Sequence, residues 1–352
     1  MSTSRRVRPK TIQIRQFIID QVDSHPKDIA DQVVRTFQIT RQAANQHLLA
    51  LGDAGTLDKT GKTRARAYHL RTRAEISLDF PAKGLEEDIP WQRDIKPALT
   101  GVSRNVLDAC SYGFTEILNN AIDHSGSEII SIYCRYTASL IELRIHDQGI
   151  GIFKKIQNDL HLESELESIK QLSKGKLTTD PAHHTGEGIF FTSRMFDQFV
   201  IMSGTLYFSH LRPDNDWLIQ TEQDQTSGTW VRMTISPHSD IDLKNLFDTY
   251  TVDKQALGFT RTHIPISVIQ HGTENLVSRS QARRLLSRFD EFEEVLLDFS
   301  GVPIIGQAFA DEIFRVYQNA HPSVAIIAIN ENPFVQSMIR RAKDRPAHKS
   351  LG

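Results

Sequence analysis

A carboxylate and a carboxamide stand four residues apart in an apolar, helix-favouring run of this chain, as Glu116 and Asn120. Residues at this spacing project from the same face of a helix, so the two side chains would meet the same space. Carboxylate and amide oxygens can serve Mg²⁺ and a water molecule. The pair therefore predicts a helix that presents polar oxygens to a bound ligand.

A second polar side chain stands where a strand is expected to end. The alternating stretch Leu140–Ile145 predicts a strand, and Asp147 follows it at the start of a turn that contains Gly149 and Gly151. An aspartate can read a base through a hydrogen bond, and glycines let the backbone approach a ligand closely. The predicted helix and this strand end together indicate a nucleotide site.

Two further segments complete a pattern that runs in chain order. Thr185–Phe191 places two glycines before a helix, and Gly228–Met233 is typical of a strand. With the segments around Glu116 and Asp147, they resemble the GHKL ATP-binding fold of type II topoisomerases, heat-shock chaperones, histidine kinases and mismatch-repair ATPases. The four pieces resemble its N box, its first and second glycine boxes and its closing strand. Each piece alone is a weak pattern, whereas four in family order are specific.

The resemblance implies roles for the residues of the predicted helix. Glu116 would be the general base that orients an attacking water, with a structural glutamate as the alternative. Asn120 would be the Mg²⁺ ligand, and phosphates and water would complete the octahedron. Asn119 would face elsewhere on the helix. Asp123 and His124, one turn further on, would contact ribose or phosphate or have a structural role.

The resemblance also implies contacts to the base and the phosphates. Asp147 would accept a hydrogen bond from the exocyclic amine of adenine, and Thr229 would lie near the adenine. The second glycine pair would open a helix whose amides and dipole suit an anion. The glycines expected to bind the cofactor are Gly149, Gly151, Gly186 and Gly188. The expected cofactors are therefore ATP and Mg²⁺.

A polar segment between Phe153 and His184 corresponds, in the same family, to the mobile lid over the phosphates. Lys174, Lys176 and Arg194 are candidate phosphate contacts, with solvated surface cations as the alternative. The pair His183–His184 lacks the nearby cysteines or spaced carboxylates of a metal site. We therefore assign these histidines to the lid or to the phosphate side.

The first 73 residues predict three short helices and a hairpin with a basic tip. Apolar spacing predicts helices over Thr11–Ser24 and from Pro26 through Val34, and Thr40 is a suitable N-cap for a third helix that ends near Asp53. The hairpin would turn at Thr60–Lys62. This order resembles a winged helix-turn-helix.

That resemblance implies binding to DNA, and charge supports it. Residues 1–73 contain fourteen Lys/Arg and six Asp/Glu, whereas the rest of the chain is acidic. The third-helix side chains expected to reach base edges are Arg41, Gln42, Asn45 and Gln46. The wing side chains expected to bind phosphates are Lys59, Lys62, Arg64 and Arg66. A basic helical domain used for protein docking is the alternative.

Beyond about Asp240, strands and helices are expected to alternate in a small α/β domain. The expected strands are His263–Ile269, Glu294–Phe299 and Ser323–Ile329, and the expected helices are Ser280–Phe289 and Ala308–Tyr317. The run Val295–Val302 resembles a STAS-type domain, and Phe309–Phe314 resembles the STAS-like branch found beside GHKL ATPases. A STAS-like domain implies a protein partner or self-association.

The C-terminal segment departs from the family pattern at one point. Anti-sigma antagonists of the STAS type carry a phosphorylatable serine or threonine at the next helix start, where this chain has Pro303–Gln307 without a hydroxyl. The departure argues against a phospho-switch and leaves Ser300 as the nearest alternative. We interpret the domain as an interaction or coupling module. Lys343, Arg345 and the last residues would form an unstructured tail.

Whole-chain properties predict a cytoplasmic, multidomain protein. Its 352 residues exceed the usual size of one core, and neither an apolar span nor a secretion signal is apparent. Cys110 and Cys134 lack metal-ligand spacing and are expected to be buried free thiols. The expected fold class is multidomain α+β and α/β. It comprises a winged helix-turn-helix over 1–73, a GHKL α/β sandwich (Bergerat fold) over 74–240 and a small STAS-like α/β domain over 241–352.

This organisation supports one leading function and two rivals. The leading hypothesis is an ATP-responsive DNA-binding regulator, in which lid closure on Mg-ATP changes how the basic module meets DNA. The first rival is a serine/threonine protein kinase of a partner-switching system, acting on a separate STAS partner. Its relatives also carry the pattern Glu-x-x-x-Asn-Ala in their N boxes. The second rival is a nucleotide-sensing scaffold with slow or absent hydrolysis.

Overall fold

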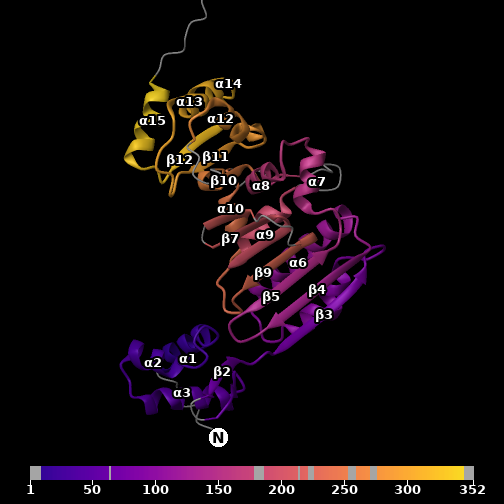
Figure 1. The fold of residues 1–352 in the computed structure, drawn as a ribbon, viewed down its shortest axis with the longest axis vertical. Helices are drawn as coiled ribbons and strands as arrows, with labels where there is room; N and C mark the ends of the chain where they lie inside the picture. The colour runs from indigo at the N-terminus through magenta and orange to yellow at the C-terminus, as the bar shows by residue number, and fades with distance from the viewer. Residues whose placement is uncertain are drawn as a thin grey trace, which may run out of the picture.

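The computed structural model describes residues 9–62, 65–177, 186–212, 215–220, 226–252, 259–269 and 276–344. These residues fold into an N-terminal unit (9–73), a central unit (74–252) and a C-terminal unit (259–344). The three units follow one another along the long axis of the molecule, with the central sheet in the middle (Figure 1).

The N-terminal unit packs three helices against a two-stranded antiparallel hairpin. Its elements are α1 (Pro9–Gln21), α2 (Ile29–Phe37), α3 (Arg41–Asp53), β1 (Leu57–Thr60) and β2 (Ala67–Leu70). The side chains of Ile18, Val33 and Leu48 fill its core and are fully buried. Thr40 caps α3 as predicted, because its hydroxyl accepts the amide of Ala43.

The N-terminal and central units meet without a long linker. Ala138, in the turn between strands β4 and β5 of the central sheet, is buried in the hydrophobic cluster of the N-terminal unit. Arg73 donates from its backbone amide to the Tyr136 carbonyl at 2.7 Å and from Nη1 to the Tyr136 hydroxyl at 2.8 Å. The turn of the sheet therefore forms part of the core of the helical unit.

The central unit is built on an antiparallel sheet. Within the described residues it has seven strands in the order β3-β4-β5-β9-β6-β7-β8. The strands are β3 (Ala74–Pro81), β4 (Ile129–Tyr136), β5 (Ile141–Asp147), β6 (Gln198–Gly204), β7 (Leu206–Leu211), β8 (Asn215–Gln220) and β9 (Thr226–Ile235). Because β9 lies between β5 and β6, residues far apart in the sequence become neighbours at the centre of the sheet.

Helices cover the sheet and shape its edge. They are α4 (Asp88–Pro90), the π-helical turn η2 (Trp91–Ile95), α5 (Lys96–Ala98), α6 (Arg104–His124), α7 (Ile152–Asp159), α8 (Glu165–Lys174), α9 (Gly188–Met195) and α10 (Leu243–Thr249). The longest, α6, buries Val106, Cys110, Phe114 and Leu118 at helical spacing. It packs on β5 and β9, and α9 packs beside it on β6. Cys110 and Cys134 are both buried and unbonded, as predicted.

The C-terminal unit has a parallel sheet with helices packed around it. Among the described residues its strands, in the order β10-β11-β12, are β10 (Arg261–Pro265), β11 (Glu294–Asp298) and β12 (Ala325–Ile329). Its helical elements are α11 (Ile266–Ile269), α12 (Arg279–Leu286), η3 (Phe289–Glu291), α13 (Gln307–Asp311), the π-helical turn η4 (Glu312–Tyr317), α14 (Gln318–Ala320) and α15 (Pro333–Lys343). The alternation of strands and helices agrees with the sequence.

Two predictions for this unit were wrong. The strand expected over His263–Ile269 ends at Pro265, which lacks the amide needed to continue a ladder, and a helical turn follows. Lys343, expected in a tail, lies in α15, which Asn332 caps and which buries Val335 and Ile339. Arg345 lies outside the described residues.

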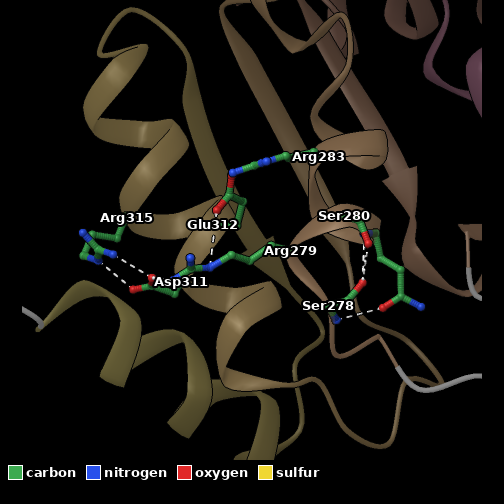
Figure 2. A network of polar contacts seen from close by, with 8 residues as sticks. Ser278, Arg279, Ser280, Arg283, Asp311, Glu312 and Arg315 are labelled. Atoms are coloured by element: carbon green, nitrogen blue, oxygen red, sulfur yellow. Dashed lines mark hydrogen bonds and ion pairs between the residues drawn. The ribbon is translucent and has the colours of Figure 1, made fainter.

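Ion pairs join α12 to the helical segment that follows β11. Figure 2 shows this network: Asp311 and Glu312, both almost fully buried, meet arginines from two elements. Arg315 donates to both oxygens of Asp311 at 2.6 Å, and Arg283 of α12 donates to Glu312 at 2.7 Å. The Arg283–Glu312 pair holds α12 against η4, whereas the Arg315–Asp311 pair lies inside the α13–η4 segment.

The central and C-terminal units share one hydrophobic cluster. The rings of Phe190 and Phe191, from α9, pack against Tyr250 and Phe259, and Phe259 packs in turn against Phe292 of the C-terminal unit.

The described residues form helices and several sheets, so the broad prediction of a mixed α and β chain is confirmed. No described helix is both long and apolar enough to cross a bilayer.

Candidate functional site

A cavity of about 370 Å³ lies between α6, the β5–β9 strand pair and the helices α7, α8 and α9. Its size is in the range of small-molecule sites. Eight residues singled out from the sequence line it: Glu116, Asn120, His124, Asp147, Gly151, Gly186, Gly188 and Thr229. Asp123 and Gly149 do not line it. The fold thus brings together residues from four separate sequence segments.

Helix α6 supplies a polar wall. Glu116, Asn120 and His124 follow one another at spacings of four residues and all line the cavity. Asn119 lines it as well, so the expectation that this side chain faces elsewhere was wrong. The reason is geometric, because positions three and four residues after Glu116 share its face of the helix.

Asp147 is the buried acid of the site. It ends β5 directly opposite Thr229 of β9 in the antiparallel register, which places both in the cavity wall. Its Oδ1 accepts the backbone amides of Gly149 at 2.9 Å and Thr229 at 3.3 Å. Burial, with 4% of the residue exposed, raises the pKa of Asp147, and these hydrogen bonds oppose the rise. The amides therefore fix one oxygen of a buried carboxyl group.

Close packing explains the glycines around Asp147. A methyl group at Gly228, which has a φ of 75°, would overlap the carbonyl of Asp147. One at Gly151, with a φ of 86°, would overlap the hydroxyl of Ser203. One at Gly149 would overlap the carbonyl of Ser125, so contact with the end of α6, rather than with the cavity, accounts for this glycine.

Gly188, the first residue of α9, lies against the carboxylate of Glu116. A methyl group on Gly188 would overlap Oε2 of Glu116 and would lie 2.9 Å from its Cδ. Gly186, with a φ of 71°, packs on the backbone of Leu177, where a methyl group would lie 2.5 Å from the carbonyl carbon. The second glycine segment therefore touches both α6 and the chain that leaves α8.

The sequence did not indicate all of the cavity wall. Lys155, in the first turns of α7, lines the cavity, and its ammonium also pairs with Asp159 at 3.0 Å. The only available signal was its position one helical turn after Gly151. Apolar side chains complete the wall: Ile117, Ala121, Ile145, Ile152, Ile156, Leu172, Leu177, Ile189, Ile201 and Val231.

Lys174 and Arg194 are neither solvated nor directed at the cavity, so both interpretations offered from the sequence were wrong. Lys174 is fully buried, and its Nζ donates to the carbonyls of Ser287 at 2.9 Å and Arg284 at 3.3 Å. Arg194 lies 3.6 Å from the centre of the Phe190 ring and donates to the Tyr250 hydroxyl. Contacts with the C-terminal unit bury Lys174, and packing inside the central unit buries Arg194; the residue type alone reveals neither.

The burial of Lys174 has a pH signature. Desolvation lowers its pKa from 10.5 to about 7; Arg288 and Lys170 add to the effect, and Glu167 and Glu291 oppose it. Between about pH 7 and pH 10 the unfolded chain therefore holds a proton at this side chain that the folded chain lacks. The free energy of unfolding should rise with pH across that window, by at most about 1.4 kcal/mol per pH unit.

The variant Lys174→Met tests this dependence. Urea unfolding of wild type and variant at pH 7, 8 and 9 should show a smaller rise in stability with pH for the variant. Equal rises would mean that Lys174 keeps its proton in the folded state.

The segment expected to form a lid is partly helical. Its first part forms α7 and α8, which pack against each other. Lys176, near its described end, donates to the Glu291 carbonyl at 2.7 Å. Residues 178–185, which include Thr185 and the pair His183–His184, lie outside the described residues.

The residues expected to contact DNA lie on α3 and on the β1–β2 hairpin of the N-terminal unit. Those exposed to solvent are Arg41, Gln42, Gln46, Lys59, Lys62 and Arg66, and Asn45 is half-buried. Arg41 forms an ion pair with Asp31 of α2. Arg64 lies outside the described residues. Lys59, Lys62 and Arg66 therefore place three exposed cations at the hairpin.

Comparison with known proteins identifies one part of the chain. The family described as a STAS-like domain of unknown function (DUF4325) matches residues 281–336. No curated protein matches the chain. The matched residues run from α12 through β11 and β12 into α15, so the STAS-like character predicted for the C-terminal unit is confirmed over this segment.

Proposed function

We propose that this chain is an ATP-binding, DNA-binding regulator in which Mg-ATP, held in the central cavity, modulates a winged helix-turn-helix module. One observation carries the proposal. Four sequence segments that resemble the GHKL motifs meet around one cavity, with a carboxylate, two carboxamides, a buried aspartate and glycines in its wall. Such a combination suits a nucleotide that has a base at one end and phosphates at the other.

Different residues of the cavity wall would contact the base and the phosphates of the nucleotide. Asp147, with Oδ1 occupied by two amides, accepts the exocyclic amine of adenine through its second oxygen. The amides and dipole at the start of α9 and the cation of Lys155 suit the phosphates. Asn120 would hold a Mg²⁺ ion there, and the ion would supply charge that screens the phosphates. Glu116, beside Gly188, is placed to accept a proton from an attacking nucleophile.

The nucleophile decides the reaction class. If it is water, the products are ADP and phosphate. If it is a hydroxyl of another protein, the chain is a kinase, for which the STAS-like segment favours a partner-switching role. Incubation with γ-³²P-ATP separates these cases: label in free phosphate indicates an ATPase, label on a partner indicates a kinase, and neither indicates a nucleotide sensor. The Glu116→Gln protein should bind ATP but lose turnover.

DNA binding by the N-terminal unit should depend on salt. Replacing Arg66, an exposed side chain at the hairpin, by alanine should weaken DNA binding and reduce the slope of log K against log [salt] by about 0.9, because one phosphate contact is lost. Fluorescence anisotropy over a salt series measures the slope. Arg104→Ala is the control, since this arginine belongs to α6 of the central unit and its side chain is 95% exposed. An unchanged slope for Arg66→Ala would exclude the wing from DNA contact.

The regulatory part of the proposal needs both ends of the chain. DNA affinity should differ between apo and Mg-ATP-bound protein at two salt concentrations, since a ligand shifts an arrangement only when it binds the two states with different affinity. Identical DNA affinity with and without bound Mg-ATP would leave two independent activities and would contradict regulation.

A further inference from the structure

The turn that leaves α8, residues 174–177, is held by hydrogen bonds from the C-terminal unit. Three successive carbonyls of this turn accept donors from that unit. Thr262 Oγ1 donates to the carbonyl of Lys174 at 2.6 Å. Arg288 Nη2 donates to the carbonyls of Gly175 at 3.0 Å and Lys176 at 2.6 Å. The backbone of the turn is therefore fixed residue by residue.

The turn also donates in the opposite direction. The side-chain nitrogen of Lys174 donates to the carbonyls of Arg284 and Ser287 at the end of α12. Lys176 reaches the carbonyl of Glu291 at 2.7 Å. Gly175 has a φ of 81°, and a methyl group there would lie 2.5 to 3.0 Å from atoms of the Phe259 and Phe190 rings, so packing reinforces the polar contacts.

Arg288 itself is held in place before it reaches the turn. Its Nε and Nη2 donate to the two oxygens of Glu291 at 2.8 and 2.7 Å, and only 16% of its side chain is exposed. It follows α12, which the Arg283–Glu312 pair anchors to η4 in Figure 2. A planar guanidinium fixed in this way donates along set directions and loses little entropy at each contact.

The turn leads directly to the phosphate side of the cavity. Leu177 lines the cavity, and Gly186 packs on the backbone of Leu177. Gly188, two residues on, touches the carboxylate of Glu116. A continuous series of contacts thus runs from Arg288 to Glu116. By contrast, Asp147 and Thr229 are positioned by the register of β5 and β9, in which the C-terminal unit has no part.

We propose that Arg288 and Thr262 are positioning residues through which the STAS-like unit completes the phosphate-binding side of the cavity within the same chain. The inference rests on the proposed nucleotide site and gives the C-terminal unit a positioning role at that site. The unit fixes residues 174–177, this turn fixes Gly186, and the amides at the start of α9 keep their places. Losing the two donors releases the phosphate side and leaves the adenine side intact.

Calorimetry with two ligands tests the proposal on the full chain. The ligands are the β,γ-imido analogue of ATP with Mg²⁺, and adenosine. Arg288→Ala should weaken binding of the triphosphate about 5- to 50-fold and change adenosine affinity less than about twofold. Arg288→Lys, which keeps the charge but not the fork, should recover part of the loss. Thr262→Val is close to isosteric. It should weaken triphosphate binding less than Arg288→Ala does and should likewise leave adenosine affinity nearly unchanged.

Arg315→Ala is the matched control, because Arg315 pairs with buried Asp311 inside the α13–η4 segment of the same unit and lies outside the path from α12 to the turn. It should leave both affinities unchanged. Amide hydrogen exchange should quicken at residues 174–177 and 186–188 in Arg288→Ala and stay at the wild-type rate in Arg315→Ala.

The possible failures are distinguishable. A wild-type chain that binds neither ligand would refute the nucleotide site itself. Triphosphate binding by Arg288→Ala and Thr262→Val at wild-type strength would overturn the positioning role alone, as would equal losses for triphosphate and adenosine. If Arg288→Ala does not fold, Thr262→Val and Arg288→Lys decide between these outcomes by the same two affinities.

Discussion

Asp147→Asn is expected to lower the affinity for ATP on the order of 10- to 100-fold, because a hydrogen bond to a charged group contributes about 1.5 to 3 kcal/mol. The amides of Gly149 and Thr229 both require an acceptor at Oδ1. Asparagine satisfies them only with its oxygen on that side, which turns its own amino group toward the adenine amine. Two donors then face each other in a buried site. Isothermal titration with ATP measures the loss.

The control for this prediction is Asp298→Asn. Asp298 also ends a strand, is 6% exposed and accepts an amide two residues on, that of Ser300 at 2.8 Å. It therefore reproduces the local structure around Asp147 outside the cavity wall. Asp298→Asn should keep ATP affinity even if it lowers stability. Unchanged ATP affinity in Asp147→Asn would remove the base-reading role and, with it, the assignment of the cavity.

Gly188→Ala is expected to lower phosphoryl transfer or ATP hydrolysis about 100-fold or more with little loss of stability. The added methyl group would overlap the end of the Glu116 side chain, which is flexible and can rotate away at small cost to the fold. A general base displaced in this way loses the contribution of about 10²- to 10⁴-fold that positioned proton transfer supplies. Steady-state turnover and thermal unfolding, measured together, check both parts.

A double-mutant cycle with Glu116→Gln sharpens this test. Because both substitutions act through one carboxylate, the double variant should be no slower than Glu116→Gln alone. Gly52→Ala is the matched control, since a methyl group there meets only the Leu57 carbonyl at an ordinary 4.0 Å. Full turnover by Gly188→Ala would show that Glu116 does not act from its observed position.

Local signals in the sequence predicted local structure well. The N-cap role of Thr40 was predictable because it depends on the residue and its next three neighbours. The strand that contains Leu143 and ends at Asp147 was predictable from alternation. The break at Pro265 was not, because the apolar run continues past it and suits a buried strand or a helix equally well.

The cavity was predicted in outline from motif order, whereas its details depend on contacts across the chain. Lys155 and Asn119 line it through the rotation of their helices, which no motif specifies. Lys174 resembles a lid cation in sequence, yet its acceptors at Arg284 and Ser287 lie more than a hundred residues away. Tertiary partners of this kind decide whether a lysine is solvated or buried.

Ala138 and Asp147 stand at opposite ends of the same stretch of backbone. Ala138 lies in the core of the N-terminal unit, and β5 runs from just beyond it to Asp147 at the cavity. Seven strand residues span about 23 Å, and their pairing with β4 and β9 prevents a one-residue slip, which would turn every side chain to the other face. Strand β5 is therefore a rigid connection between the N-terminal unit and the cavity. A tilt of β5 at the Asp147 end would be expected to move the helical unit at the other end, without a flexible linker between them.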